Sequence, residues 1–291
     1  MPAVAHQRIG ERAQVDRPCP MCGVGELYVH FTYDTQPPLE TRFPLAAGSR
    51  YWRELHRCAQ CGHYLEYFPL DQAALYGGEY VTATYGDSSG LRKSFERINA
   101  LPAERSDNVQ RVRHIVAFCD GYWSAERWSQ RKPALLDVGA GLGVFPYRMQ
   151  EAGWECTALD MDPRQVQHLR EVAGVRAELG DVRASGELGR FDLITFNKVL
   201  EHVPDPIDVL ASSTQKLLPD GLVYIELPDG EAAEVEGKER EEYLLGHIHV
   251  FSFASFALLV ARARLRLLSC ERLQEPSTKY TLRGFARAEG A

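Results

Sequence analysis

The chain has 291 residues, of which 45% are hydrophobic and 25% charged, a composition that excludes an intrinsically disordered protein. Its 33 basic and 40 acidic residues leave a formal net charge of −7, which argues against a nucleic-acid partner. No apolar run approaches the roughly 18 residues of a membrane span, and the first residues lack the apolar core of a secretory signal. We therefore expect a cytoplasmic protein without membrane contact, in which the seven cysteines stay reduced.

Two Cys-x-x-Cys pairs mark the first part of the chain. Cys19 and Cys22 form the first pair, Cys58 and Cys61 form the second, and a glycine follows each pair. Such a glycine permits the tight turn in which backbone amides donate to sulfur. Because four thiolates complete the coordination of tetrahedral zinc, we predict a structural zinc site in a small ribbon-like domain. Two alternatives stay open, namely two unrelated thiol pairs and the replacement of one cysteine by His63.

The composition changes at the turn-prone stretch 86–90, after which helical and strand-like patterns alternate. Helices are expected at about 104–118, up to 152, from 162, from 205 and at 252–264. Strands are expected at 134–138, 156–160, 175–179, 191–196, 222–227, 267–273 and 279–288. This alternation predicts a doubly wound, mostly parallel α/β sheet, whose last two strands pair antiparallel because no helix separates them. We expect a zinc-binding domain at 1–88 and the α/β domain at 89–291.

The strongest pattern is the Leu-Leu-Asp-Val-Gly-Ala-Gly-Leu-Gly segment at 135–143. Glycines at alternate positions after a buried strand let the backbone turn sharply and approach a ligand that a Cβ atom would exclude. A nicotinamide dinucleotide site would require glycine in place of Val144, and Asp137 would repel its pyrophosphate. A carboxylate there suits a ligand with an amine or a sulfonium group. Asp160, at the end of the next strand, is placed to hold a ribose diol.

From about Leu91 onwards the chain resembles the class I S-adenosylmethionine-dependent methyltransferases. The resemblance rests on the glycine segment and on Ala-Leu-Asp at 158–160, Gly-Asp-Val at 180–182, the Phe-Asp-Leu-Ile to Val-Pro-Asp-Pro stretch at 191–206, and Leu-Leu-Pro-Asp-Gly at 217–221. It implies a seven-stranded Rossmann-like methyltransferase fold with S-adenosylmethionine as cofactor. The cofactor-binding residues that it implies are Asp137 for the amine, Gly139, Gly141 and Gly143 under the amino-acid part, Asp160 for the ribose hydroxyls, Asp181 and Val182 for the adenine, and Asn197.

Glu201 and His202, just after the fourth expected strand, are candidates for the general base that a hydroxyl or carbon-acid acceptor requires. A four-cysteine segment ahead of this core is similar to the sugar C-methyltransferases that act on nucleotide-linked keto-sugars. That resemblance implies proton abstraction by the Glu-His pair and an N-terminal tyrosine, a role that falls on Tyr80. The chain departs from that group because it ends at Ala291 without their further C-terminal domain. A purely structural Glu-His pair is the alternative.

His247 and His249 are further candidates, as a base or as acceptor contacts, and the alternative is that they pack beneath a lid. We expect a small-molecule acceptor methylated on carbon or oxygen, such as a sugar or a natural-product intermediate. The competing functions are a ribosomal RNA base methyltransferase with a zinc element and a non-catalytic scaffold that only binds the cofactor. The net charge argues against the first, and the intact glycine triplet with its two carboxylates argues against the second.

Overall fold

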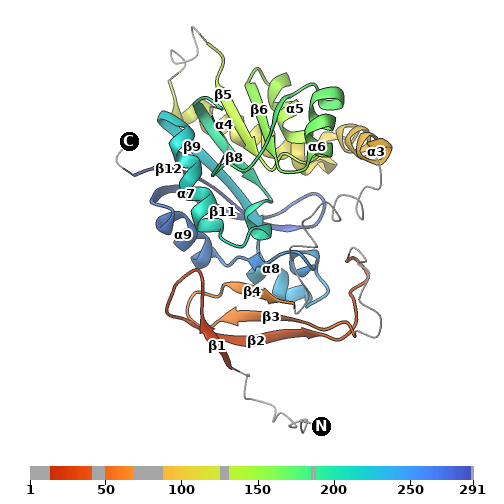
Figure 1. Ribbon diagram of the computed structural model, residues 1–291, viewed down its shortest axis with the longest axis vertical. Helices are drawn as coiled ribbons and strands as arrows, with labels where there is room; N and C mark the ends of the chain where they lie inside the picture. The colour runs from red at the N-terminus through yellow and green to blue at the C-terminus, as the bar shows by residue number, and fades with distance from the viewer. Residues whose placement is uncertain are drawn as a thin grey trace.

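The computed structural model describes residues 14–40, 50–68, 88–124, 131–184, 186 and 188–289. Two sheets dominate this part of the chain, and Figure 1 shows the smaller, N-terminal sheet lying beneath the larger one. None of the helices in these ranges combines the length and the apolar character that a bilayer crossing requires.

The larger sheet contains seven of the described strands, in the order β11-β12-β9-β8-β5-β6-β7. They are β5 (Ala134–Val138), β6 (Glu155–Asp160), β7 (Arg176–Leu179), β8 (Phe191–Asn197), β9 (Leu217–Pro228), β11 (Leu265–Gln274) and β12 (Tyr280–Ala288). Among them β12 runs antiparallel to both neighbours, and the pairs from β9 to β7 are parallel. The predicted mostly parallel sheet with an antiparallel closing pair is confirmed. The chain changes direction across the sheet between β5 and β8, and ligands of open α/β sheets bind at such a switch point.

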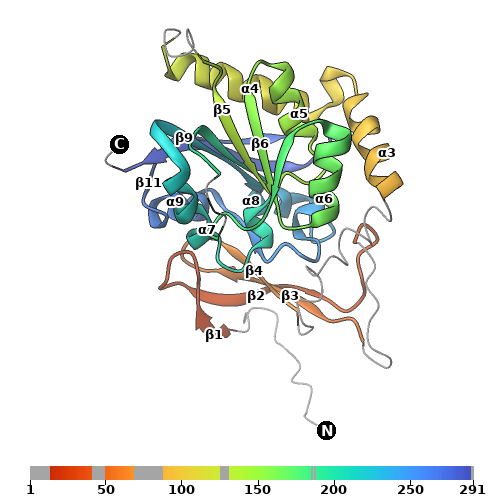
Figure 2. The same cartoon turned by 45° about the horizontal axis from the view of Figure 1, so that its top comes forward.

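Helices cover both faces of the larger sheet (Figure 2). One face carries α3 (Ser88–Asn99), α4 (Asp107–Tyr122), α5 (Val144–Glu151) and α6 (Pro163–His168), and the other carries α7 (Pro206–Ser213) and α9 (Phe253–Arg262). The carboxylates of Asp162 and Asp205 accept hydrogen bonds from the first turns of α6 and α7. These are the N-caps that the Asp-Pro sequences predict.

The turn expected at the turn-prone stretch 86–90 is wrong for its last three residues, because α3 begins at Ser88. Leu91 and Phe95 are buried one helical turn apart, and Phe95 meets Tyr147 and His168 edge-on. This packing outweighs the turn preference of the Ser-Ser-Gly stretch, since tertiary contacts override local propensity.

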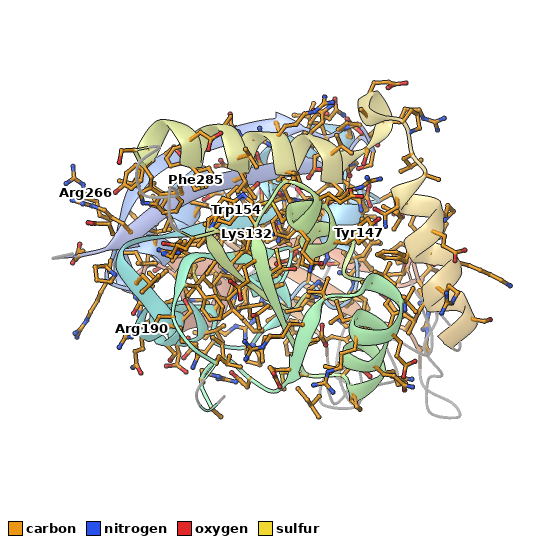
Figure 3. The ribbon with its side chains drawn as sticks, turned by 90° about the horizontal axis from the view of Figure 1, so that it is seen from above. Lys132, Tyr147, Trp154, Arg190, Arg266 and Phe285 are labelled. Atoms are coloured by element: carbon orange, nitrogen blue, oxygen red, sulfur yellow. The ribbon has the colours of Figure 1, made fainter. Side chains whose placement is uncertain are left out.

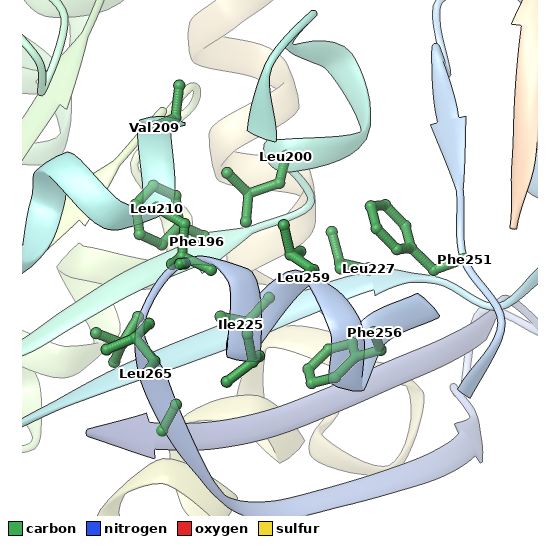
Figure 4. Close-up of a cluster of buried hydrophobic side chains, with 14 of the residues drawn as sticks. Phe196, Leu200, Val209, Leu210, Ile225, Leu227, Phe251, Phe256, Leu259 and Leu265 are labelled. Atoms are coloured by element: carbon green, nitrogen blue, oxygen red, sulfur yellow. The ribbon is translucent and has the colours of Figure 1, made fainter. Parts of the chain in front are cut away.

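Side chains of the central strands alternate between two apolar cores, one on each face of the sheet. Leu135 points into the core under α4 and α5, whereas Leu136 points into the core under α7 and α9. Figure 4 shows the second core, in which Phe196 and Ile225 from the sheet lie near Leu259 of α9. Figure 3 shows the first core from above, with Phe285 beneath α4.

The N-terminal sheet is antiparallel, in the order β1-β2-β3-β4-β10. Its strands are β1 (Gln14–Pro18), β2 (Glu26–Tyr33), β3 (Arg53–Cys58), β4 (Tyr64–Tyr67) and β10 (His249–Val250). The last of these comes from the C-terminal part of the chain and pairs with β4. Apolar residues of this sheet, including Leu27 and Leu65, belong to the same core as α9. The two sheets therefore share packing, and the division into 1–88 and 89–291 stays a prediction.

Candidate functional site

The glycine segment forms a tight loop between β5 and α5. All three glycines have left-handed backbone angles, with φ of +68° at Gly139, +53° at Gly141 and +72° at Gly143. A Cβ atom at Gly143 would lie 2.5 Å from the Leu169 side chain, so any larger residue would disturb the packing there. Among the described residues, a Cβ atom at Gly141 would meet nothing nearer than a backbone oxygen at 4.0 Å. The space beside Gly141 is therefore open to a ligand.

Asp160 ends β6 and ties this loop to the sheet. Its Oδ2 accepts a hydrogen bond from the Gly141 amide at 2.9 Å, and its Oδ1 accepts one from the Asp162 amide at 3.0 Å. Burial raises the pKa of Asp160, and the two amides oppose that rise by favouring the ionised form. Because each carboxylate oxygen has a further lone pair, Asp160 can still accept hydrogen bonds from a diol.

Asp137 and Asn197 lie at the switch point, on the carboxyl ends of β5 and β8. Oδ1 of Asp137 accepts hydrogen bonds from the Thr195 hydroxyl at 2.7 Å and from Asn197 Nδ2 at 2.8 Å. Burial raises the pKa of Asp137 to about 7, although these hydrogen bonds favour its ionised form. Oδ1 of Asn197 is buried and has no hydrogen-bond partner among the described residues. An orphaned acceptor beside a buried carboxyl favours a ligand with a charged donor.

Asp181 and Val182 follow β7 at the same edge of the sheet. The Gly180 amide donates to the Asp160 carbonyl at 2.9 Å, which places this turn beside Asp160. Val182 is buried, whereas the Asp181 carboxylate pairs with the Arg183 guanidinium and accepts the Arg183 amide at 2.8 Å. The hydrogen bond to the Arg183 side chain lowers the pKa of Asp181.

These groups fit S-adenosylmethionine. Its ammonium group matches the orphaned Asn197 oxygen and Asp137, and its ribose diol matches the remaining lone pairs of Asp160. The open side of Gly141 leaves room for the amino-acid part, and Val182 offers an apolar surface for a base.

A second polar cluster, which we call the Glu-His-His cluster, consists of Glu201, His202 and His247. One possible ligand atom from each of the three lies within 4.8 Å of the others. Glu201 is fully buried, and neither of its carboxylate oxygens has a hydrogen-bond partner in the described part of the chain. Nδ1 of His202 lies 2.8 Å from the Gly246 carbonyl oxygen, and Nδ1 of His247 lies 2.8 Å from that of Glu242. Since a carbonyl only accepts, both rings carry a proton on Nδ1.

The Glu-His-His cluster borders the glycine loop, because the segment leading to Glu201 lies against it. A Cβ atom at Gly139 would fall 2.7 Å from the Val199 side chain. Burial raises the pKa of the Glu201 carboxyl. Burial and the neighbouring His202 lower the pKa of His247 to about 3, so the His247 ring is neutral near pH 7.

The sequence analysis did not predict a buried ion-pair network that lies beside the Glu-His-His cluster. Nε of Arg111 in α4 donates to Oε2 of Glu226, near the end of β9, at 2.6 Å. Glu275 lies 3.8 Å from the same guanidinium and 3.7 Å from the Lys198 ammonium group. Burial disfavours an ionised Glu226, but Arg111 overcomes this and holds the pKa of Glu226 at about 2. The one available sequence signal was a glutamate inside the apolar run of β9.

The four cysteines of the two Cys-x-x-Cys pairs come together, with all four sulfur atoms within 4.8 Å of one another. Cys19 Sγ lies 3.7 Å from Cys61 Sγ, and Cys22 Sγ lies 3.7 Å from Cys58 Sγ. Zinc–sulfur bonds of about 2.3 Å place the sulfurs of a tetrahedral site about 3.8 Å apart, so this geometry fits zinc. A Cβ atom at Gly25 would lie 2.2 Å from Cys58 Sγ, so the site also requires glycine at that position.

The remaining predicted residues lie elsewhere. Nε2 of His63 lies 3.0 Å from Nδ1 of His249, and His63 Nδ1 lies 3.3 Å from the Ser255 hydroxyl, so His63 is not part of the cysteine cluster. His249 lines a cavity of about 560 Å³ between β1, β4 and the segment around Pro204, whereas His247 is not one of its lining residues. Tyr80 lies outside the described residues.

Comparison with known proteins identifies a methyltransferase domain over residues 105–269. The ubiquinone biosynthesis O-methyltransferase of Actinobacillus pleuropneumoniae is 29% identical over 166 residues, which cover 53% of this chain and 64% of that protein. The chain therefore spans less than two thirds of the length of this relative.

Two solved structures share the fold. The magnesium protoporphyrin IX methyltransferase of Synechocystis superposes with a TM-score of 0.55 and 13% identity, covering 74% of this chain and all of that one. The 1,6-didemethyltoxoflavin-N1-methyltransferase of Burkholderia thailandensis superposes with a TM-score of 0.51 and 20% identity. This match covers 79% of this chain and 96% of that one. The methyltransferase domain matched at 105–269 spans more than half of the residues of this chain. The chain therefore belongs to the class I S-adenosylmethionine-dependent methyltransferase domain family.

Proposed function

We propose that this protein transfers the methyl group of S-adenosylmethionine to a small-molecule acceptor. The observation that carries the proposal is the orphaned Asn197 oxygen beside Asp137, at the strand ends that border the open glycine loop. A charged donor would satisfy that oxygen, and the amine of S-adenosylmethionine is such a donor.

S-adenosylmethionine supplies an electrophilic methyl group on a positively charged sulfur. In the proposed site Asp137 and Asn197 would hold its ammonium group, and Asp160 would accept hydrogen bonds from the ribose hydroxyls. Val182 and Asp181 would contact the adenine. The three glycines let the backbone approach the amino-acid part. Because methyl transfer is an in-line displacement, holding donor and acceptor in line can account for about 7–11 kcal/mol of the barrier reduction.

A hydroxyl or carbon-acid acceptor must also lose a proton. Glu201 and His202 are the proposed acceptor-side groups, since they follow β8 directly and His202 carries its proton on Nδ1, which leaves Nε2 as the basic nitrogen. The name of the relative from Actinobacillus pleuropneumoniae, an O-methyltransferase, supports an oxygen acceptor. A sugar or another natural-product intermediate remains the proposed substrate class, and the net charge of −7 argues against RNA.

We also propose that the cysteine cluster binds zinc in a structural role. Four sulfur ligands complete a tetrahedral shell and leave no position for a substrate. The surrounding N-terminal sheet is small, so metal binding would supply much of its folding free energy.

Calorimetric titration with S-adenosylmethionine tests the proposed function. Asp160→Ala should weaken binding at least tenfold, because the ribose hydroxyls would lose their acceptor. Asp120→Ala, which removes an exposed carboxylate on α4, is the matched control and should leave the affinity unchanged. Equal affinities for the wild type and Asp160→Ala would remove the ribose assignment, and no binding by the wild type at millimolar cofactor would refute the proposed function.

A further inference from the structure

The Glu-His-His cluster contains an unusual buried group. The Glu201 carboxyl is fully buried, and neither of its oxygens has a hydrogen-bond partner among the described residues. An ionised carboxylate in such a place carries an uncompensated charge, and a protonated carboxyl would have an unsatisfied donor instead. Either form is costly, so the described residues alone leave the cluster incomplete.

The two imidazoles are hydrogen-bonded to the backbone as metal-binding histidines usually are. Nδ1 of His202 is held by the Gly246 carbonyl, and Nδ1 of His247 is held by the Glu242 carbonyl, at 2.8 Å in each case. A neutral ring that donates from Nδ1 presents its lone pair at Nε2. Metal-binding histidines typically donate their other N–H to a carbonyl or a carboxylate, which fixes both the tautomer and the ring plane.

We infer that Glu201, His202 and His247 form a second metal site, which binds a divalent first-row transition ion such as zinc and leaves positions open for an oxygen of the acceptor. Two imidazoles and one carboxylate are a common ligand set for catalytic zinc and for ferrous iron. Bonds of about 2.0–2.2 Å place ligand atoms about 3–3.5 Å apart. Ligand atoms that now lie within 4.8 Å of one another would have to close by an ångström or so.

The N-terminal sheet holds the segment that carries one of these ligands. Oε2 of Glu66 accepts a hydrogen bond from the Gly246 amide at 3.3 Å, and Arg53 donates to the Tyr243 carbonyl at 2.6 Å. Both contacts fix the backbone just before His247. The sheet that carries the cysteine cluster therefore positions this ligand as well.

The inference rests on the proposed function for its chemistry. An acceptor hydroxyl bound to the ion would lose its proton to water more readily, because the cation stabilises the resulting alkoxide. The oxygen lone pair then bonds to the methyl carbon while the carbon–sulfur bond breaks, and its electron pair goes to sulfur. One positive charge disappears at sulfur, and one proton enters solution. Under this inference His202 is a ligand, and the bound acceptor needs no separate base.

Metal counting on the full chain tests the site. The wild type and the variants Glu201→Gln and His247→Gln are dialysed with zinc and, in parallel, with manganese, and bound metal is measured by elemental analysis after free ions are removed. His249→Gln is the matched control, because it replaces a buried imidazole outside the cluster. Calorimetric titration with S-adenosylmethionine on the same samples shows whether each variant is folded.

We expect two metal ions per chain in the wild type and in His249→Gln, and one in Glu201→Gln and His247→Gln. A wild type with one zinc and purely sulfur ligation by X-ray absorption, and no ion gained with manganese, would overturn the inference. So would an unchanged count in Glu201→Gln. If S-adenosylmethionine binds and the second metal is missing, the inference fails while the proposed function stands. If the metal count is two and the cofactor does not bind, the proposed function fails while the second site stands.

Discussion

The cysteine cluster differs in construction from the edge of the larger sheet at which its parallel strands end, which we call the carboxyl edge. Each half of the cysteine cluster comes from one short Cys-x-x-Cys turn, with a left-handed glycine at Gly23 or Gly62 directly after it. The carboxyl edge gathers side chains from several strands and from loops far apart in the sequence. Within the described part of the chain, side-chain oxygens of Asn197 and Glu201 lack a hydrogen-bond partner there. One metal ion can bind all four sulfurs of the cysteine cluster, whereas buried polar groups without a hydrogen-bond partner favour the binding of a ligand. The difference supports the proposed structural role of the cysteine cluster and the proposed cofactor binding at the carboxyl edge.

Removing one ligand from the cysteine cluster should have the largest effect on stability. In Cys58→Ser we expect loss of the metal and of the N-terminal sheet, with unfolding free energy lower by about 5 kcal/mol and a melting temperature lower by about 10–20 °C. Calorimetric melting with elemental analysis measures both effects. Cys270→Ser, which changes a half-buried thiol outside the cluster, should shift the melting temperature by only a few degrees. Similar melting of the two variants would contradict a structural metal.

The ion-pair network at the carboxyl edge should be the next most sensitive feature. Glu226→Gln leaves the buried charge of Arg111 without its close partner, and we expect a cost of about 3–5 kcal/mol in denaturant unfolding. Glu271→Gln, which removes a half-exposed partner of Arg283, should cost less than about 1 kcal/mol. Equal costs would mean that the network does not support this edge.

The same network predicts the acid sensitivity of the fold. The pKa of Glu226 is about 2 in the folded protein against an ordinary 4.5, so its ionised form contributes stability that is fully present above about pH 4.5. That contribution is lost as the pH falls from 4.5 towards 2. Unfolding free energies measured across this window should fall less steeply in Glu226→Gln than in the wild type. Parallel curves would show that other carboxylates dominate.

The glycine loop should show a smaller effect on stability and a distinct effect on binding. Gly141→Ala places a side chain at φ of +53°, which costs about 1 kcal/mol, and fills the space that we assign to the cofactor. Gly174→Ala is the matched control, because its φ is +66° and its Cβ atom would likewise be uncrowded by the described residues. Both variants should melt alike, but only Gly141→Ala should lose tenfold or more in affinity for S-adenosylmethionine by calorimetry. Equal affinities would place the cofactor elsewhere.

Much of the fold was predictable because its signals are local. Several features each depend on neighbours only a few residues away. They are the strands around Leu135 and Ile194, the helix N-caps at Asp162 and Asp205, and the left-handed glycines. The helix beginning at Ser88 was missed for the opposite reason, since its apolar face is defined by contacts with distant helices. The pairing of β10 with β4 likewise joins segments far apart in the chain.

The sequence by itself determined the α/β class, the glycine loop, the carboxylates at the strand ends and the two cysteine turns, because short-range sterics and hydrogen bonding specify each of them. Only the tertiary structure separated His247 from His249, and only it buried Glu201 without a hydrogen-bond partner among the described residues. It also paired Arg111 with Glu226. These contacts form only when segments far apart in the sequence pack together. Burial then removes water from the polar side chains, so each charge or lone pair needs a specific partner in the protein or a ligand.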